Sequence, residues 1–179
     1  MAFCKSKTMI VYHGSYLKIE TPRIITSEKG RDFGFGFYTT TIKAQAERWA
    51  VRIAKLHSRI TQQPCDAVIN VYEYNPDGGK SLKNKDFPNA DGEWLDMVIN
   101  CRTNPVFRHG FDIVSGKIAN DSVGETVEYV IAGVMRKEDA IERLRFEEIN
   151  NQICFCTEAA LQTISFKDSY TIPKTDLNG

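Results

Sequence analysis

Long hydrophobic runs are missing from this sequence of 179 residues. No stretch approaches the roughly 18 consecutive apolar side chains that indicate a membrane-spanning helix, so no membrane association is expected. The apolar run within residues 1–14 is too short for the core of a secretory signal, and residues 9–12 are more typical of a strand. The sequence therefore predicts neither a membrane span nor secretion.

Cysteine pairs with the spacing of metal sites are also missing. The five cysteines are odd in number and form no C-x-x-C pair. This argues against a disulfide framework and against a zinc site, so we expect no bound metal and a reducing, cytoplasmic location. Cys154 and Cys156 alternate with apolar residues and are predicted to be small buried side chains.

Net charge is zero, with 23 Lys and Arg against 23 Asp and Glu, but the charges are unevenly distributed. Residues 1–60 hold 11 basic against 4 acidic side chains, or +7, and the remainder holds 12 against 19, or −7. A basic N-terminal part can attract an anionic ligand or partner. Equally, the two parts can neutralise each other across the fold.

The spacing of apolar residues predicts an α+β fold. Strands and helices do not alternate strictly, which favours a mixed or antiparallel sheet over a doubly wound one. There are no internal repeats, so we expect one domain over residues 1–172 and a loose tail over 173–179. The main predicted strands are residues 8–14, 66–75, 111–118, 151–157 and 163–172, and the predicted helices are 41–60, 92–102, 120–134 and 136–146.

The helix predicted over residues 41–60 has the clearest pattern, with Thr41 available as its cap. A basic outer face of this kind can bind nucleic acid, but with Trp49 turned inward it lacks the interleaved aromatic side chains that such binding favours. The residues predicted to face the core are Ile42, Ala46, Trp49, Ala50, Ile53 and Ile60, and those on the outer face are Arg48, Arg52, Lys55 and Arg59.

Two short motifs are candidates for a functional site. Residues 11–14, VYHG, place one of only three histidines at the end of an apolar run, directly before Gly14. Residues 32–40, DFGFGFYTT, then form a Gly-broken turn that leads into a short strand. A strand rather than a helix follows the G-x-G, so a dinucleotide-binding Rossmann fingerprint is not present. Taken singly, His13 and the turn each have an ordinary structural interpretation.

Taken in order, these motifs and the helix opening IKAQAERWA resemble the NAD-binding half of ADP-ribosyltransferases. The resemblance is to the His-Tyr-Glu branch, which includes diphtheria-type toxins and poly(ADP-ribose) polymerases. Within that branch the chain is similar to a bacterial family described only as a domain of unknown function. This similarity extends through EWLDMVINCR, NDSVGETVE and ERLRFEEINNQICFCTEAAL, and covers roughly residues 9–166. Genes of that family often lie beside small partner genes, which implies toxin–antitoxin systems.

The resemblance implies an ADP-ribosyltransferase-like split β-sheet core with flanking helices, and NAD as the substrate. Gly14 would pair its backbone with the nicotinamide carboxamide, and His13 would hydrogen-bond a ribose hydroxyl. An aromatic ring at Tyr38 would stack on the nicotinamide. The other residues expected around NAD are Ser15 as a hydrogen-bond donor, Phe37 or Tyr12 as a second ring, Arg31, Lys43 or Arg23 at the pyrophosphate, and Asp121, with Asn120, in a loop near the pocket.

The third position of the branch differs in this chain. A Glu there bonds the ribose 2′-hydroxyl and stabilises the cationic transition state, but the matching residue here is Gln152. If Glu were optimal, losing its charge would cost on the order of 10²–10³ in rate. Asp121, Glu125 or Glu128 can supply a charge instead.

The resulting expectation is a mono-ADP-ribosyltransferase, with His13, Tyr38 and Gln152 as its catalytic set. It would cleave the nicotinamide–ribose bond of NAD and transfer ADP-ribose to a protein or nucleic acid. It would act as an intracellular bacterial toxin held by a small antitoxin protein. The alternatives are an NAD glycohydrolase and a catalytically silent module that binds NAD or ADP-ribose.

Overall fold

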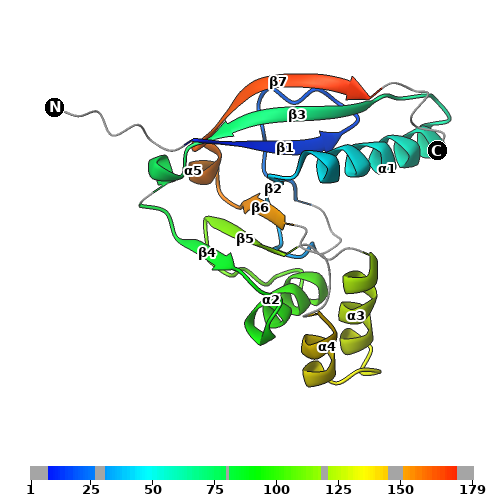
Figure 1. The fold of residues 1–179 in the computed structure, drawn as a ribbon, viewed down its shortest axis with the longest axis vertical. Coiled ribbons are helices and arrows are strands. Elements are labelled where there is room, and N and C mark those ends of the chain that lie inside the picture. Colours follow the sequence, from blue (N-terminus) through cyan, green and yellow to red (C-terminus); the bar gives the residue numbers. More distant parts are fainter. Residues whose placement is uncertain (1–7, 27–30, 80, 118–120, 145–150, 173–179) are drawn as a thin grey trace. The chain divides into compact units, whose positions relative to one another are not determined.

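The chain forms an α+β fold with two separate sheets (Figure 1), as the irregular order of predicted strands and helices indicated. The computed structural model describes residues 8–26, 31–79, 81–117, 121–144 and 151–172, so the tail predicted at 173–179 lies outside the described residues. Two compact units share the chain. Unit 1 consists of Met1–Pro22, Tyr38–Ser81 and Ala159–Gly179, and unit 2 consists of Arg23–Phe37 and Leu82–Glu158.

Unit 1 is a three-stranded antiparallel sheet with one long helix against it (Figure 1). Its strands are β1 (Met9–Ser15), β3 (Ala67–Tyr74) and β7 (Ile164–Ile172), in the order β1-β3-β7. The central strand β3 alternates buried and half-buried side chains along most of its length, as a strand with one covered face should. Helix α1 (Lys43–Thr61) packs on β1 and β3.

The contact between α1 and the sheet is very close because small residues line it. The buried side chains of α1 are Ala46, Ala50 and Ala54. At Gly14, in β1, an added Cβ would lie 2.3 Å from the carbonyl oxygen of Ala46 and 2.7 Å from the amide nitrogen of Ala50. Both atoms belong to the backbone and cannot move aside, so only glycine fits at this position. Gly14 therefore has a packing role whatever it binds.

The orientation predicted for α1 is wrong in two respects. Trp49 is 44% exposed and Ile60 is 72% exposed, although both were expected in the core. The close approach to β1 admits only alanine-sized side chains, so the larger apolar residues lie to one side of the contact. The cap prediction is also wrong, because Ile42 occupies the N-cap position and makes no side-chain cap hydrogen bond.

Unit 2 contains most of the second sheet, whose strand order is β2-β6-β5-β4. β4 (Asn84–Phe87) runs parallel to β5 (Ile113–Lys117), which runs antiparallel to β6 (Asn151–Phe155). The chain passes from unit 2 to unit 1 within β2 (Phe37–Thr39). The sheet is thus mixed, in agreement with the sequence prediction.

Three helices complete unit 2, close to their predicted positions: α2 (Gly92–Thr103), α3 (Asp121–Ile131) and α4 (Lys137–Leu144). The Asp91 side chain caps α2 by accepting a hydrogen bond from the amide of Trp94 at 3.0 Å. Trp94 itself is fully buried. None of the helices within the described residues combines the length and apolar character needed to cross a membrane.

Short elements were not predicted from the sequence. Strand β4 reads NKDF, with no apolar alternation, and α5 (Glu158–Leu161) has only four residues. The 3₁₀ turn η1 (Pro76–Gly79) follows β3. In each missed element the local pattern is too short for a helical or strand period to be visible.

Candidate functional site

The two motifs singled out in the sequence meet within unit 1. His13 lies near the end of β1, and its Nδ1 is 2.6 Å from the backbone carbonyl oxygen of Tyr38. A carbonyl can only accept, so Nδ1 carries the proton, and in the neutral ring Nε2 is an acceptor. The side chain is only 8% exposed, so this bond fixes both the tautomer and the direction of the ring.

Backbone pairing holds the motifs side by side. The amide of Tyr12 donates to the carbonyl of Thr40 at 2.8 Å, and the amide of Thr40 donates to the carbonyl of Tyr12 at 2.9 Å. This isolated antiparallel bridge joins β1 to the end of the Gly-rich segment. The 24 residues between His13 and Tyr38 are therefore closed into a loop by the bridge and the His13 bond.

Alternation in β2 separates its two aromatic side chains. Phe37 is buried in the core, whereas Tyr38 points the other way and is half-buried. Of these two rings, Tyr38 is the one that is partly exposed. Ser15 is buried, and its hydroxyl oxygen accepts the amide hydrogen of Leu17 at 3.3 Å.

A buried asparagine, which sequence reasoning missed, fixes the segment after β1. Asn70 of β3 pairs in register with His13 and has no exposed surface. Its Nδ2 donates to the carbonyl of Leu17 at 3.0 Å, and its Oδ1 accepts from the amide of Ile19 at 2.7 Å. The Tyr72 hydroxyl also donates to the carbonyl of Ile19, at 2.5 Å. The one signal in the sequence is a polar residue in an otherwise apolar part of the strand.

Gln152 lies in β6 of unit 2 and is only 5% exposed. Its Nε2 donates to Oδ2 of Asp32 at 3.3 Å. Because a carboxylate only accepts, this contact determines which end of the amide is the nitrogen. The amide oxygen Oε1 is thus the end directed away from Asp32.

Asp32 brings a buried negative charge next to Gln152. Arg102 of α2 donates from Nε and Nη2 to Oδ1 of Asp32, at 2.9 and 2.7 Å. Arg102 also donates from Nη1 to Glu128 of α3 at 3.2 Å. Each oxygen of Asp32 therefore has its own partner, Arg102 on one side and Gln152 on the other. Neither Asp32 nor Arg102 was identified from the sequence, although Asp32 begins the Gly-rich motif.

The turn between Asp32 and β2 depends on two glycines. Gly34 has a φ of 72°, which side chains other than glycine rarely adopt. At Gly36 an added Cβ would lie 2.3 Å from Sγ of Cys154 and 2.8 Å from the carbonyl oxygen of Phe155. The G-x-G pattern is therefore explained by a left-handed turn followed by close packing against β6.

The basic residues proposed for the pyrophosphate are divided between the two units: Lys43 belongs to unit 1, and Arg23 and Arg31 belong to unit 2. Lys43 Nζ is 3.8 Å from Glu47 Oε1 and 5.0 Å from the ring centre of Tyr170. The hydroxyl of Tyr170 donates to Glu47 at 2.9 Å, and burial, with Glu47 beside it, raises the pKa of Tyr170. Arg31 is half-buried in unit 2 and Arg23 is exposed there.

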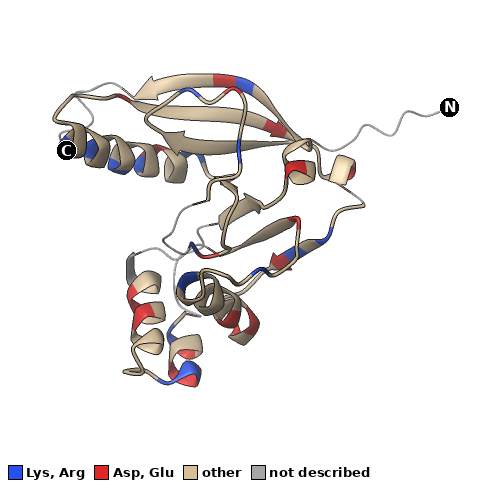
Figure 2. Ribbon diagram, turned by 180° about the vertical axis from the view of Figure 1, so that it is seen from behind, with Lys and Arg blue, Asp and Glu red and all other residues tan. Residues whose placement is uncertain are grey.

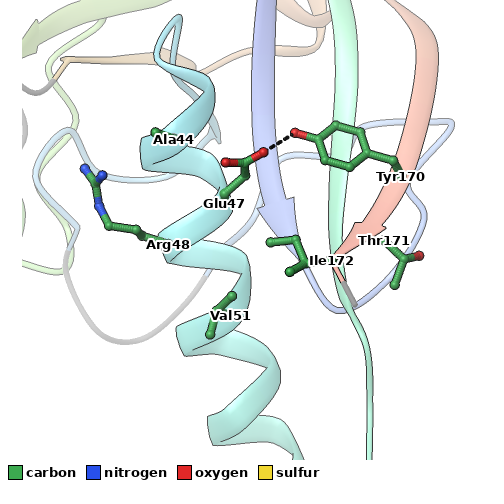
Figure 3. Close-up of a pocket in the computed structure, with 7 residues that line it drawn as sticks. All are labelled: Ala44, Glu47, Arg48, Val51, Tyr170, Thr171 and Ile172. Carbon is green, nitrogen blue, oxygen red and sulfur yellow. Dashed lines mark hydrogen bonds between the residues drawn. The ribbon is translucent and has the colours of Figure 1, made fainter. Parts of the chain in front are cut away.

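Glu47 and Tyr170 belong to a pocket of about 580 Å³ within unit 1, between α1 and the end of β7 (Figure 3). Figure 3 shows the hydrogen bond between Glu47 of α1 and Tyr170 of β7, and the Arg48 side chain pointing away from that bond. None of the residues predicted to hold NAD lines this pocket. Its lining residues are Ala44, Glu47, Arg48, Val51, Tyr170, Thr171 and Ile172.

The position predicted for Asp121 needs correction. Asp121 is the first residue of α3 rather than part of a loop, because the helix begins there, and Asn120 lies outside the described residues. Of the other acids considered, Glu128 joins Arg102 as described above. Glu125 is exposed on α3.

The cysteines of unit 2 have unequal surroundings. Cys154 is fully buried, as predicted, but Cys156 is only half-buried. The Sγ atoms of the two residues lie 3.4 Å apart. The hydrogen bond to Cys154, opposed by burial and helped by a hydrogen bond with His109, lowers the pKa of Cys156 to about 6. Among the described residues, no three His, Cys, Asp or Glu side chains come together as a metal site.

Comparison with known families assigns the chain to a family but does not assign it a chemical activity. Residues 9–166 match the model of a family described as "Protein of unknown function (DUF3990)". The chain belongs to this DUF3990 family. The match has the extent predicted from the sequence motifs, and it includes every residue predicted around NAD. No curated protein and no solved structure matches this DUF3990 chain.

Proposed function

We propose that the chain is an NAD-dependent mono-ADP-ribosyltransferase. The observation that carries this proposal is the 2.6 Å bond between His13 Nδ1 and the carbonyl of Tyr38. It joins the His-Gly strand end to the Tyr of the Gly-rich motif, and these are two of the motifs that carry the resemblance to the His-Tyr-Glu branch. Nε2 of the neutral ring would then accept a hydrogen bond from a ribose hydroxyl, and Tyr38 would stack on the nicotinamide.

The Gln152 amide supports the same proposal from unit 2. With its nitrogen bound to Asp32, Oε1 would accept a hydrogen bond from the ribose 2′-hydroxyl. Asp32 would supply part of the negative charge that Gln152 lacks. It would not supply all of it, because Arg102 forms an ion pair with the same carboxylate. Positive charge develops on the ribose as nicotinamide leaves, and a fixed carboxylate favours it.

The direct test uses NAD labelled in its ADP-ribose part, incubated with the purified protein and a cell extract. We expect release of nicotinamide and transfer of label to a macromolecule. His13→Ala should reduce both by about 10²-fold or more. The matched control is His57→Ala, which removes a different histidine, on α1. The His57 ring stacks on the Tyr16 ring, with 3.9 Å between the ring centres. Wild-type label transfer in His13→Ala, or none in either protein, would refute the proposal.

Two alternatives give different outcomes in the same experiment. Nicotinamide release without label transfer would identify an NAD glycohydrolase. Calorimetric binding of NAD without release would identify a silent binding module, which Gln152 in place of Glu favours. Where label is transferred, treating the labelled extract with protease or with nuclease shows whether the acceptor is protein or nucleic acid.

The proposed cellular role is that of an intracellular toxin controlled by a small antitoxin protein. Its support is the resemblance alone. Induced expression of the chain in bacteria should stop growth, and His13→Ala should remove the effect. Growth that is unaffected by the wild-type protein, at equal expression, would count against this role.

A further inference from the structure

An exposed apolar stripe runs along one side of α1. Trp49, Leu56 and Ile60 are 44%, 52% and 72% exposed, and Ile53 between them is half-buried. These positions are separated by four, three and four residues, so the side chains lie above one another on the helix. Single exposed apolar residues are ordinary, but a contiguous row of large ones is typical of a binding surface.

A row of basic side chains borders this apolar stripe. Figure 2 shows blue segments repeating along α1. Residues 43–61 contain five Lys and Arg against one acid, Glu47, which is bonded to Tyr170. Within the row, the Arg52 guanidinium lies 5.8 Å from the centre of the Trp49 ring, which joins the two stripes. The basic row consists of Arg48, Arg52, Lys55 and Arg59, with the same helical spacing as the apolar stripe.

We propose that this side of α1 docks an acidic amphipathic helix of a partner protein. Apolar side chains of that helix, spaced by three and four residues, would cover Trp49, Leu56 and Ile60. Its Asp and Glu would face the basic row, where Arg forms paired hydrogen bonds with carboxylates. Trp and Arg are the residue types most enriched among the side chains that dominate such interfaces. The proposal uses no NAD-site residue and does not depend on the proposed function.

The aliphatic part of the stripe favours a protein over a nucleic acid. Single strands bind through aromatic rings that stack on successive bases, and here Trp49 is the one aromatic residue in the stripe, with Arg52 beside its ring. Leu56 and Ile60 would gain little from phosphate or base edges. An anionic membrane fits less well also, because the stripe has the basic row on one side and the packed core on the other. Helices that lie in a membrane surface have a broad apolar face opposite their polar one.

The probe is a synthetic acidic peptide of about 20 residues that carries Leu at helical spacing and Glu elsewhere, labelled for fluorescence anisotropy. Its control is a peptide of the same composition with the Leu spacing scrambled. We expect the patterned peptide to bind the full chain at least about tenfold more tightly than the scrambled one. Binding should also weaken as salt is raised.

Matched variants locate the site on the protein. Ile60→Glu should weaken binding about tenfold or more, whereas Val106→Glu, at a residue 79% exposed in unit 2, should change it less than about twofold. Arg52→Glu should weaken binding, whereas Arg136→Glu, at a side chain 79% exposed at the start of α4, should not. Each pair compares the same change of charge at two exposed positions. Unchanged circular dichroism confirms that each variant is folded.

Three results would overturn the proposal. Equal binding of the scrambled peptide would show attraction by charge alone. Tighter binding of single-stranded RNA or of anionic lipid vesicles, lost in Ile60→Glu, would assign the surface to those ligands instead. Absence of peptide binding would leave α1 as a solvated helix face.

Discussion

The amide nitrogen of Gln152 lies 3.3 Å from the Asp32 carboxylate, which Arg102 holds from the other side. Gln152 is therefore the uncharged partner of a neighbouring acid. Two carboxylates at this separation would repel each other, and burial would increase that cost. The chain has its acid at Asp32 and its amide at Gln152.

Gln152→Glu should therefore destabilise the protein. The change removes the hydrogen bond and places a second carboxyl beside Asp32, which should cost about 1–3 kcal/mol, or roughly 3–10 °C in Tm. Asp32 raises the pKa of the new Glu in the folded state, so the folded protein binds protons more tightly than the unfolded one. Stability is then retained at low pH and is lost as pH rises through the raised pKa.

Thermal melting at pH 5 and pH 8 measures this effect. The difference between wild type and Gln152→Glu should be larger at pH 8. The double variant Asp32→Asn, Gln152→Glu restores one acid and one amide, and should recover most of the loss at pH 8. A single variant that is as stable as the wild type at both pH values would contradict the Asp32–Gln152 contact.

Gly14→Ala should destabilise unit 1 by about 1–3 kcal/mol, because the new Cβ would overlap backbone atoms of α1. The matched control is Gly124→Ala in α3, where an added Cβ has no neighbour within 4 Å. Alanine there should stabilise the helix by roughly 0.5–1 kcal/mol. Chemical denaturation of both variants gives the comparison, and a neutral Gly14→Ala would show that α1 does not approach β1 so closely.

The two tryptophans should report opposite environments. Trp49 is 44% exposed and Trp94 is fully buried, so acrylamide should quench part of the fluorescence strongly and the rest weakly. Trp49→Phe should leave only a blue-shifted component that resists quenching, and Trp94→Phe only the quenchable one. The opposite assignment would mean that Trp49 faces the core, as the hydrophobic pattern alone predicted.

Cys156 should react with iodoacetamide at lower pH than an ordinary thiol. Hydrogen bonds with Cys154 and His109, opposed by burial, lower its pKa to about 6, so the reactive thiolate should be the main form at pH 7. Labelling should fall as pH decreases through about 6. Burial raises the pKa of Cys101 to about 12, so that residue should remain unlabelled in the folded protein.

Peptide mapping by mass spectrometry assigns the label to each cysteine, and Cys156→Ser is the control. Denaturation before labelling should bring all the cysteines to the same pH dependence. A Cys156 that reacts only above about pH 8 in the folded protein would show that its thiol is not hydrogen-bonded in this way.

Long elements were predictable from the sequence because many residues repeat the same period. The strands that begin with Met9 and Ile164, and all three helices of unit 2, lie within a few residues of their predicted bounds. β4 was missed because four residues with two charges show no period. The buried face of α1 was predicted only in part: Ala46 and Ala50 are buried as expected, but Trp49 is exposed. Hydrophobicity ranks Trp49 above Ala46, whereas close packing against Gly14 admits only the smaller residue.

The candidate site was also predictable only in part. The resemblance predicted that His13 and Tyr38 would lie at the same site, but it did not predict the hydrogen bond between His13 and the Tyr38 carbonyl. The contacts of Asp32 with Arg102 and Gln152 join residues 70 and 120 positions apart, and no local pattern marks them. Asn70 was missed because a single Asn in a strand looks the same in sequence whether it is solvated or holds a loop.

The division of the chain into interleaved segments limits how it can be dissected and when it can fold. The chain passes between the two units four times, so no single cut separates them. A fragment of residues 23–158 would contain all of unit 2 but also α1 and β3, which would then lack both neighbouring strands. In unit 1, Ala67 pairs with Ile172, so the sheet can close only after β7 has been synthesised and has left the ribosome. A product that stops between β3 and β7 therefore exposes an unpaired edge of β3, which can pair with another chain.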